Sequence, residues 1–111
     1  MVDQLLETAL RIHADLPVVD GHNDLPWRLR TAADGDLDAA DPRQSLPDYH
    51  TDIPRMLEGG VGAQFWSLSV PADIPDPYRR TIEPIELVEA MVARDPGLEL
   101  ATTAAEVRRI R

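Results

Sequence analysis

Apolar residues recur at helical spacing near the start of the chain. Four of them, separated by four, three and four positions, form one stripe of an amphipathic helix: Leu5, Ala9, Ile12 and Leu16. We therefore predict a helix over about residues 3–14, with Asp3 as its N-cap and Pro17 beyond its end. A helix of this kind needs a core on which to lay its apolar stripe.

Two segments have the pattern of β-strands. The first covers residues 18–22, where a β-branched pair leads into the turn signal at Gly21. The second covers residues 61–70, an almost continuous apolar run bounded by Gly60 and Pro71. Such a run is typical of a strand that is buried on both faces in a parallel sheet.

Capping signals predict three further helices. The first covers residues 51–58, with Thr51 as its N-cap and Gly59-Gly60 at its end. The second covers residues 82–94, between the cap Thr81 and the breaker Pro96-Gly97. The third begins at the capping box formed by Thr103 and Glu106 and continues to the C-terminus, residue 111.

Residues 28–50 are rich in helix breakers and carboxylates, so we expect a long exposed loop there. A loop of this length is either functional or a sign that an element has been missed. Its acidic part, residues 34–38, has the alternating carboxylates of a calcium loop. The register excludes that interpretation, because a loop starting at Asp34 has Ala39 at position 6 and Ser45 at position 12. A solvated acidic loop is the better interpretation.

The order of helices and strands predicts an α/β fold with a parallel sheet. Two strands make a poor sheet, since a buried parallel strand needs a neighbour on each edge. We therefore interpret residues 1–111 as the N-terminal segment of a larger architecture.

Composition narrows the possible functions. The chain has 111 residues, 20 acidic against 11 basic, and a formal net charge of −9, which argues against nucleic acid as a partner. There is no cysteine, so any metal site must use His, Asp or Glu. We see no signal peptide and no membrane-spanning run, and therefore expect a cytoplasmic location.

The candidate chemistry lies at the end of the first strand. His22 and Asp24 would point to the same side of an extended backbone and could converge on one metal ion. A polar turn in which Asp20 and Asp24 satisfy backbone amides explains the same residues, and the spacing alone favours it. We interpret His50 and Thr51 as a helix cap with its neighbour, and His13 as a surface or packing residue.

Three separated strings, read together, carry more information. They are residues 20–27 (DGHNDLPW), 50–55 (HTDIPR) and 59–67 (GGVGAQFWS). In this order they resemble the membrane dipeptidase (renal dipeptidase) family of zinc metallopeptidases, and the similarity runs from about residue 16 to the C-terminus. Within the last string, we expect residues 64–67 to pack in the interior.

The resemblance implies a (β/α)8 TIM-type barrel with two zinc ions at its C-terminal mouth, of which this chain would supply the first two β/α units. It implies hydrolysis of dipeptides by a hydroxide that attacks the peptide carbonyl. His22 and Asp24 match the ligands of one zinc, and Trp27 matches a residue that lines the substrate pocket, although a packing role explains Trp27 equally well. Ser69 stands where many relatives have Tyr. The other ligands in the family come from later strands.

Two hypotheses follow for the function. The first is a zinc-dependent dipeptidase that acts on small dipeptides, although we expect the 111-residue chain alone to be inactive and assign no catalytic residue in it. The alternative is a truncated, non-catalytic remnant or interaction module of the same family. In either case, exposed strand edges would favour homo-oligomers.

Overall fold

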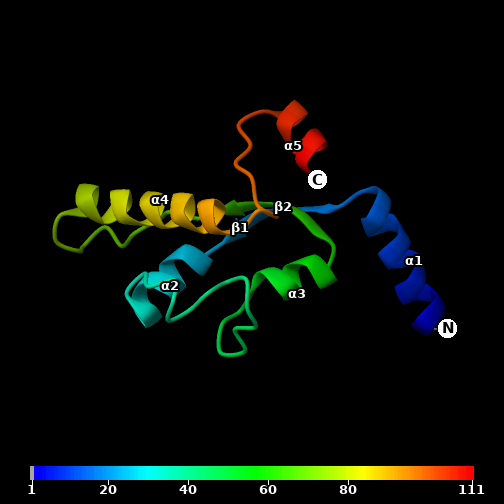
Figure 1. Cartoon of the computed structure of the whole chain (residues 1–111), viewed down its shortest axis with the longest axis horizontal. Coiled ribbons are helices and arrows are strands. Elements are labelled where there is room, and N and C mark those ends of the chain that lie inside the picture. Colours follow the sequence, from blue (N-terminus) through cyan, green and yellow to red (C-terminus); the bar gives the residue numbers. More distant parts are fainter. Residues whose placement is uncertain (1) are drawn as a thin grey trace.

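The chain alternates helices with two strands. The computed structural model describes residues 2–111, and its elements are α1 (Val2–Asp15), β1 (Val18–Asn23), α2 (Leu25–Ala33), α3 (Ile53–Glu58), β2 (Val61–Trp66), α4 (Pro77–Arg94) and α5 (Ala104–Ile110) (Figure 1). The two strands pair in parallel. The predicted α/β class with a parallel sheet is therefore confirmed.

The sheet brings the carboxyl ends of both strands to one edge. Val19 pairs with Ala63 and Asn23 with Trp66. The register shifts between Val18 and Val19, and again between Asp20 and Asn23. The prediction that the second strand is buried on both faces is wrong. By alternation Ala63 and Phe65 share a face with Val19, and Phe65 is 66% exposed because none of the described residues covers it there. The strand also ends at Trp66, before the predicted residue 70.

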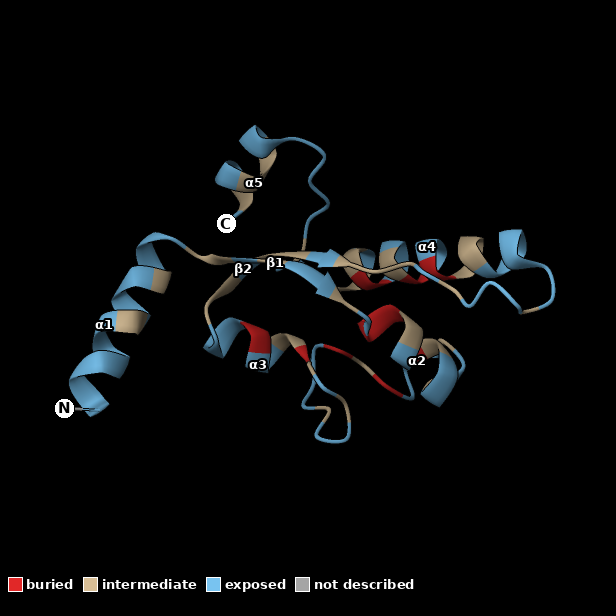
Figure 2. Cartoon of the chain, turned by 180° about the vertical axis from the view of Figure 1, so that it is seen from behind, coloured by how far each residue is buried: buried red, intermediate tan, exposed pale blue. Residues whose placement is uncertain are grey.

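The hydrophobic core lies between α2, α4 and the segment that follows α2. Figure 2 shows its buried residues as red stretches on those elements, while α1 and α5 have none. Trp66, at the end of β2, packs against this core, whereas the exposed Phe65 departs from the interior packing expected of residues 64–67. The buried members of the core are Leu25, Leu29, Leu37, Ala40, Leu87 and Met91.

The expected loop over residues 28–50 is wrong in its first part. Residues 28–33 complete α2, which buries Leu25 and Leu29 at a spacing of four. Pro26 lies in the first turn, where the helix needs no N–H from it. The signal that ends the helix is Asp34, which adopts the left-handed conformation with φ 55°.

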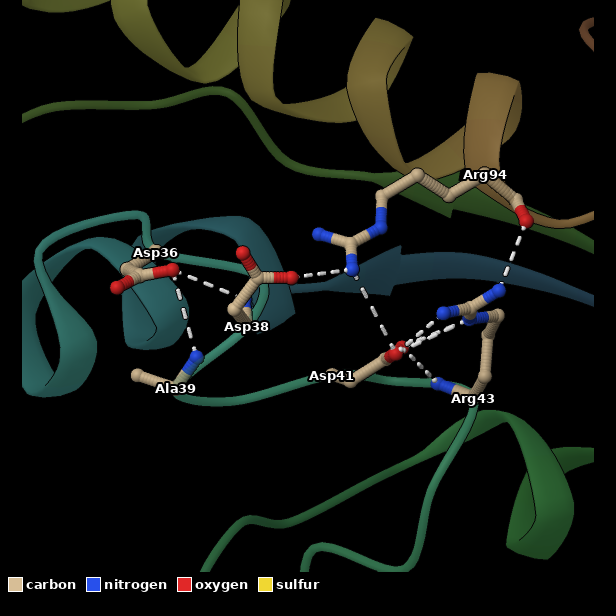
Figure 3. Close-up of polar contacts among 6 residues, drawn as sticks. All are labelled: Asp36, Asp38, Ala39, Asp41, Arg43 and Arg94. Atoms are coloured by element: carbon tan, nitrogen blue, oxygen red, sulfur yellow. Dashed lines mark hydrogen bonds and ion pairs between the residues drawn. The ribbon is translucent and has the colours of Figure 1, made fainter.

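The carboxylates of Asp34, Asp36 and Asp38 are exposed, as expected of a solvated acidic loop, but charged contacts also join the segment to α4. Asp41 accepts hydrogen bonds from the Arg43 guanidinium at 2.7 to 3.1 Å, and Arg94 of α4 donates to Asp38 at 2.7 Å (Figure 3). Arg43 also donates to the carbonyl oxygen of Arg94 at 3.0 Å. The Asp36 carboxylate accepts the N–H of Asp38 at 2.9 Å. The two bonds that involve Arg94 hold the segment against α4.

Two predicted helix starts move to an earlier or later Asp. The N-cap of α3 is Asp52 and not Thr51, because the Asp52 side chain accepts the N–H of Arg55 at 2.8 Å. The N-cap of α4 is Asp76, so this helix begins one turn earlier than the predicted cap Thr81. The predicted capping box of α5 is confirmed, with Glu106 N–H donating to Thr103 Oγ1 at 3.1 Å.

The first helix forms as predicted, but it does not lie on the core. In both views α1 projects from one end of the molecule (Figures 1 and 2), and Leu5 is 67% exposed. Asp3 lies inside its first turn and is not its cap. The radius of gyration of 15.6 Å exceeds the roughly 13 Å typical of a compact chain of this length. Among residues 2–111, no helix has the length and apolar character needed to cross a membrane.

Candidate metal site

The site lies where β1 ends and α2 begins. His22 is the last residue but one of β1, Asn23 ends the strand, and Asp24 occupies the N-cap position of α2. This is the carboxyl end of a parallel strand, where α/β proteins commonly place their ligands. The local sequence favours this geometry, because Pro26 is well suited to the first turn of a helix.

The structure brings His22 and Asp24 together, as the spacing predicts. His22 Nε2 lies 3.1 Å from Asp24 Oδ2. Both side chains are open to solvent, with exposed fractions of 67% and 63%. The Asp24 carboxylate makes no capping hydrogen bond, although Asp24 stands at the N-cap. The alternative, in which Asp20 and Asp24 satisfy backbone amides, therefore holds for Asp20, whose Oδ1 accepts the N–H of His22 at 3.5 Å, but not for Asp24.

The capping role falls to Asn23, which the sequence analysis missed. Its Oδ1 accepts the N–H of Leu25 at 2.9 Å, and its Nδ2 donates to Thr51 Oγ1 at 3.1 Å. Its backbone carbonyl accepts the N–H of Ser67 at 2.9 Å, just beyond β2. Asn23 thus joins β1 to three other segments. The signal in the sequence was an Asn directly before an Asp at a helix start, since either residue can cap.

Asp52 fixes the segment that carries Thr51. Asp52 is fully buried and accepts the N–H groups of Leu46 and Arg55 as well as the Arg55 Nε–H. Burial disfavours the charged form of this carboxyl, but the three donors outweigh it, so the pKa of Asp52 lies below its ordinary value. The negative charge is retained in the interior at neutral pH.

The pair can supply two ligands to a cation. Two ligand atoms about 2 Å from a tetrahedral zinc ion lie about 3.3 Å apart, close to the observed separation of 3.1 Å between Nε2 and Oδ2. Imidazole nitrogen and carboxylate oxygen suit zinc and several other divalent metals. Within residues 2–111, no three His, Cys, Asp or Glu side chains gather closely enough to hold a metal ion.

The remaining candidates lie outside the pair. Trp27 is half-buried in the first turn of α2, and Ser69 is exposed beyond the end of β2. His50 is exposed in the loop before α3. His13 packs against Gly60, where an added Cβ would come within 2.8 Å of the His13 Cβ. The packing role predicted for His13 agrees with this contact.

Comparison with known proteins assigns the class and then the family. The chain is similar to curated dipeptidases, which are hydrolases: it is 40% identical over 103 residues to Dipeptidase 3 of Mus musculus. It is 34% identical over 122 residues to Dipeptidase verJ of Clonostachys rogersoniana, and 34% identical over 116 residues to Dipeptidase ataJ of Aspergillus terreus. The family model described as Membrane dipeptidase (Peptidase family M19) matches residues 6–111. The chain belongs to this membrane dipeptidase family.

The chain corresponds to part of each relative. The three matches cover 91%, 96% and 95% of this chain but only 21%, 31% and 28% of the respective relatives. The chain therefore spans about a fifth to a third of their length. The resemblance seen in the three sequence strings is confirmed at the level of the family.

Proposed function

We propose that this chain supplies half of a metal site for the hydrolysis of dipeptides. The observation that carries the proposal is the solvent-open pair His22 and Asp24, which lie 3.1 Å apart at the carboxyl end of a parallel strand. Family membership supports a hydrolytic reaction, and the relatives named dipeptidases support a dipeptide as substrate.

We place β1 and β2 as the first two strands of a (β/α)8 barrel. They are consecutive neighbours in a parallel sheet, and α2 and α3 lie in the connection between them. The apolar side chains Val19 and Phe65 are exposed on one face of this sheet, as expected for strands that pack against further strands across a barrel interior. Residues 1–111 are then the N-terminal segment of a dipeptidase-type barrel.

In this proposal each residue of the site has a defined task. His22 Nε2 and Asp24 Oδ2 hold one of two zinc ions, and Trp27 borders the bound substrate three residues further along. A zinc ion at this position would act as a Lewis acid on the peptide carbonyl. Until a metal binds, His22 and Asp24 satisfy each other by a hydrogen bond, which keeps both side chains in a binding orientation.

Metal binding tests the proposed ligands directly. We expect the purified chain to bind zinc weakly, because a catalytic zinc takes three protein ligands and the pair supplies two. His22→Ala and Asp24→Asn should each weaken binding about tenfold or more, whereas His50→Ala, which removes an exposed His elsewhere, should leave it unchanged. Equal zinc affinity in His22→Ala and the unmodified chain would overturn the assignment.

A chimera tests the reaction. This chain would replace the matching segment of Dipeptidase verJ, with unmodified Dipeptidase verJ as the reference for hydrolysis of a dipeptide panel. We expect hydrolysis that His22→Ala abolishes and His50→Ala preserves. A folded, zinc-loaded chimera without turnover would favour the non-catalytic alternative. Turnover by the 111-residue chain alone, lost on His22→Ala, would show that copies of the chain complete the site together.

A further inference from the structure

Asp24 occupies the N-cap position of α2, but its side chain does not cap the helix. Asp is among the strongest N-cap residues because its carboxylate can accept the free N–H groups of the first turn. In this structure the Asp24 carboxylate makes no such bond and instead faces His22 Nε2. Something else must fix the backbone at Asp24 so that this carboxylate faces His22.

The side chain of Asn23 fixes that backbone by closing a turn across Asp24. Asn23 Oδ1 accepts the N–H of Leu25 at 2.9 Å, from the residue before Asp24 to the residue after it. This bond depends on which way the Asn23 amide is turned. If the amide were flipped, its NH2 group would face the N–H of Leu25, and two donors would meet.

Thr51 anchors that amide. Asn23 Nδ2 donates to Thr51 Oγ1 at 3.1 Å, and the Thr51 hydroxyl also lies 3.4 Å from Asn23 Oδ1. Both side chains are half-buried. Thr51 is itself held in place, because the next residue is the buried, multiply hydrogen-bonded Asp52.

We propose that Asn23 and Thr51 are positioning residues that keep the Asp24 carboxylate directed toward His22. This inference rests on the metal site proposed above. Without the Thr51 hydroxyl the Asn23 side chain loses its anchor, its bond to the Leu25 N–H weakens, and the backbone at Asp24 is no longer fixed. The carboxylate would then leave His22, so loss of a hydroxyl on a loop that is distant in sequence would weaken a site that it does not touch.

Thr51→Val is the sharpest test, because it removes the hydroxyl and preserves the shape and charge of the side chain. We expect it to lower zinc affinity about tenfold, the scale of lost supporting hydrogen bonds around metal ligands. Thr51→Ser restores the hydroxyl and should stay within about twofold of the unmodified chain. Thr31→Val, a matched change on the exposed side of α2, should have no effect. Zinc affinity would be measured by competition with a chromophoric chelator.

A second measurement needs no metal. In the metal-free chain, Thr51→Val should accelerate hydrogen exchange at the Leu25 amide and shift the ¹⁵N resonance of His22 Nε2, while Thr31→Val changes neither. Thr51→Ala, which removes the same hydroxyl, serves if the Val variant does not fold, as judged by circular dichroism. An unmodified chain that binds no zinc would overturn the proposed metal site. Unchanged exchange and an unchanged His22 resonance in the Thr51 variants would overturn the positioning role.

Discussion

The backbone N–H and the guanidinium Nε–H of Arg55 both donate to the buried carboxylate of Asp52, each at 2.8 Å. The Arg55 guanidinium also reaches the carbonyl oxygens of Leu46 and Tyr49, at 2.9 and 2.7 Å. The Asp52–Arg55 pair therefore closes the loop of residues 46–52 onto the start of α3. Thr51, the proposed support of the metal site, lies on this closed loop.

Replacement of Asp52 should destabilise the chain. Asp52→Ala removes the N-cap of α3 and leaves the N–H of Leu46 without its acceptor, so we expect the free energy of unfolding to fall by about 2–3 kcal/mol. Urea denaturation measures this change. Asp48→Ala, a matched change at an exposed position of the same loop, should stay within about 0.5 kcal/mol. A similar loss for both variants would contradict a special role for Asp52.

The same carboxyl should make stability depend on pH in acid. The pKa of Asp52 is lowered from its ordinary 3.8, because its hydrogen bonds outweigh the effect of burial. Below about pH 4 the unfolded carboxyl therefore takes up a proton before the folded one, and stability rises with pH in that range. The contribution is fully present above this range and is lost as pH falls through the folded pKa. Asp41, paired with Arg43, contributes in the same direction.

Asp52→Asn should therefore flatten the acid limb of the stability curve without abolishing it. The measurement is the free energy of unfolding between about pH 5 and pH 2 for both chains. Asn preserves the capping oxygen but does not titrate, so the two curves should converge toward low pH. Parallel curves over the whole range would show that the Asp52 carboxyl has the same pKa in both states.

Any side chain introduced at Gly62 should lower the free energy of unfolding. A Cβ added at Gly62 would lie 2.3 Å from the Cβ of Pro17, whereas a Cβ at Gly21 would have no atom within 4 Å. Gly62→Ala must therefore shift β2 away from the joint between α1 and β1, at a cost of about 1–3 kcal/mol. Thermal unfolding of both variants measures the difference. Equal melting temperatures for Gly62→Ala and Gly21→Ala would show that the joint adapts without cost.

The sequence predicted elements well where one local signal dominates. The capping box of Thr103 and Glu106 starts α5, and the end of α4 falls before Pro96-Gly97 as expected. It failed where two candidate caps compete, as with Thr51 and Asp52, because the choice depends on the contact of Arg55 with the buried Asp52 carboxylate. The burial of Leu37 and Ala40 was also missed, since it depends on packing with α2 and α4.

For the site, the pattern predicted the convergence of His22 and Asp24 but not what maintains it. Their spacing of two residues is visible in the sequence, whereas Asn23 and Thr51 are 28 residues apart and meet only in the fold. The pattern also does not show that Asp24 occupies an N-cap position at which its carboxylate makes no capping bond. The family resemblance suggested His22 and Asp24 as the ligands that we propose, and the hydrogen bonds around Asn23 supply a physical reason for their placement.

The exposed apolar stripe of α1 should make the isolated chain associate with copies of itself. Leu5, Ile12 and Leu16 lie on this stripe and are each more than half exposed, and Phe65 adds apolar surface on the sheet. We expect the average mass in sedimentation experiments to rise with concentration. Leu5→Glu combined with Ile12→Glu should suppress this rise. Gln4→Glu combined with Ala14→Glu, an equal charge change outside this stripe, should not. If both double variants suppress association equally, net charge and not the apolar stripe controls it, because only the first pair removes apolar side chains from the stripe.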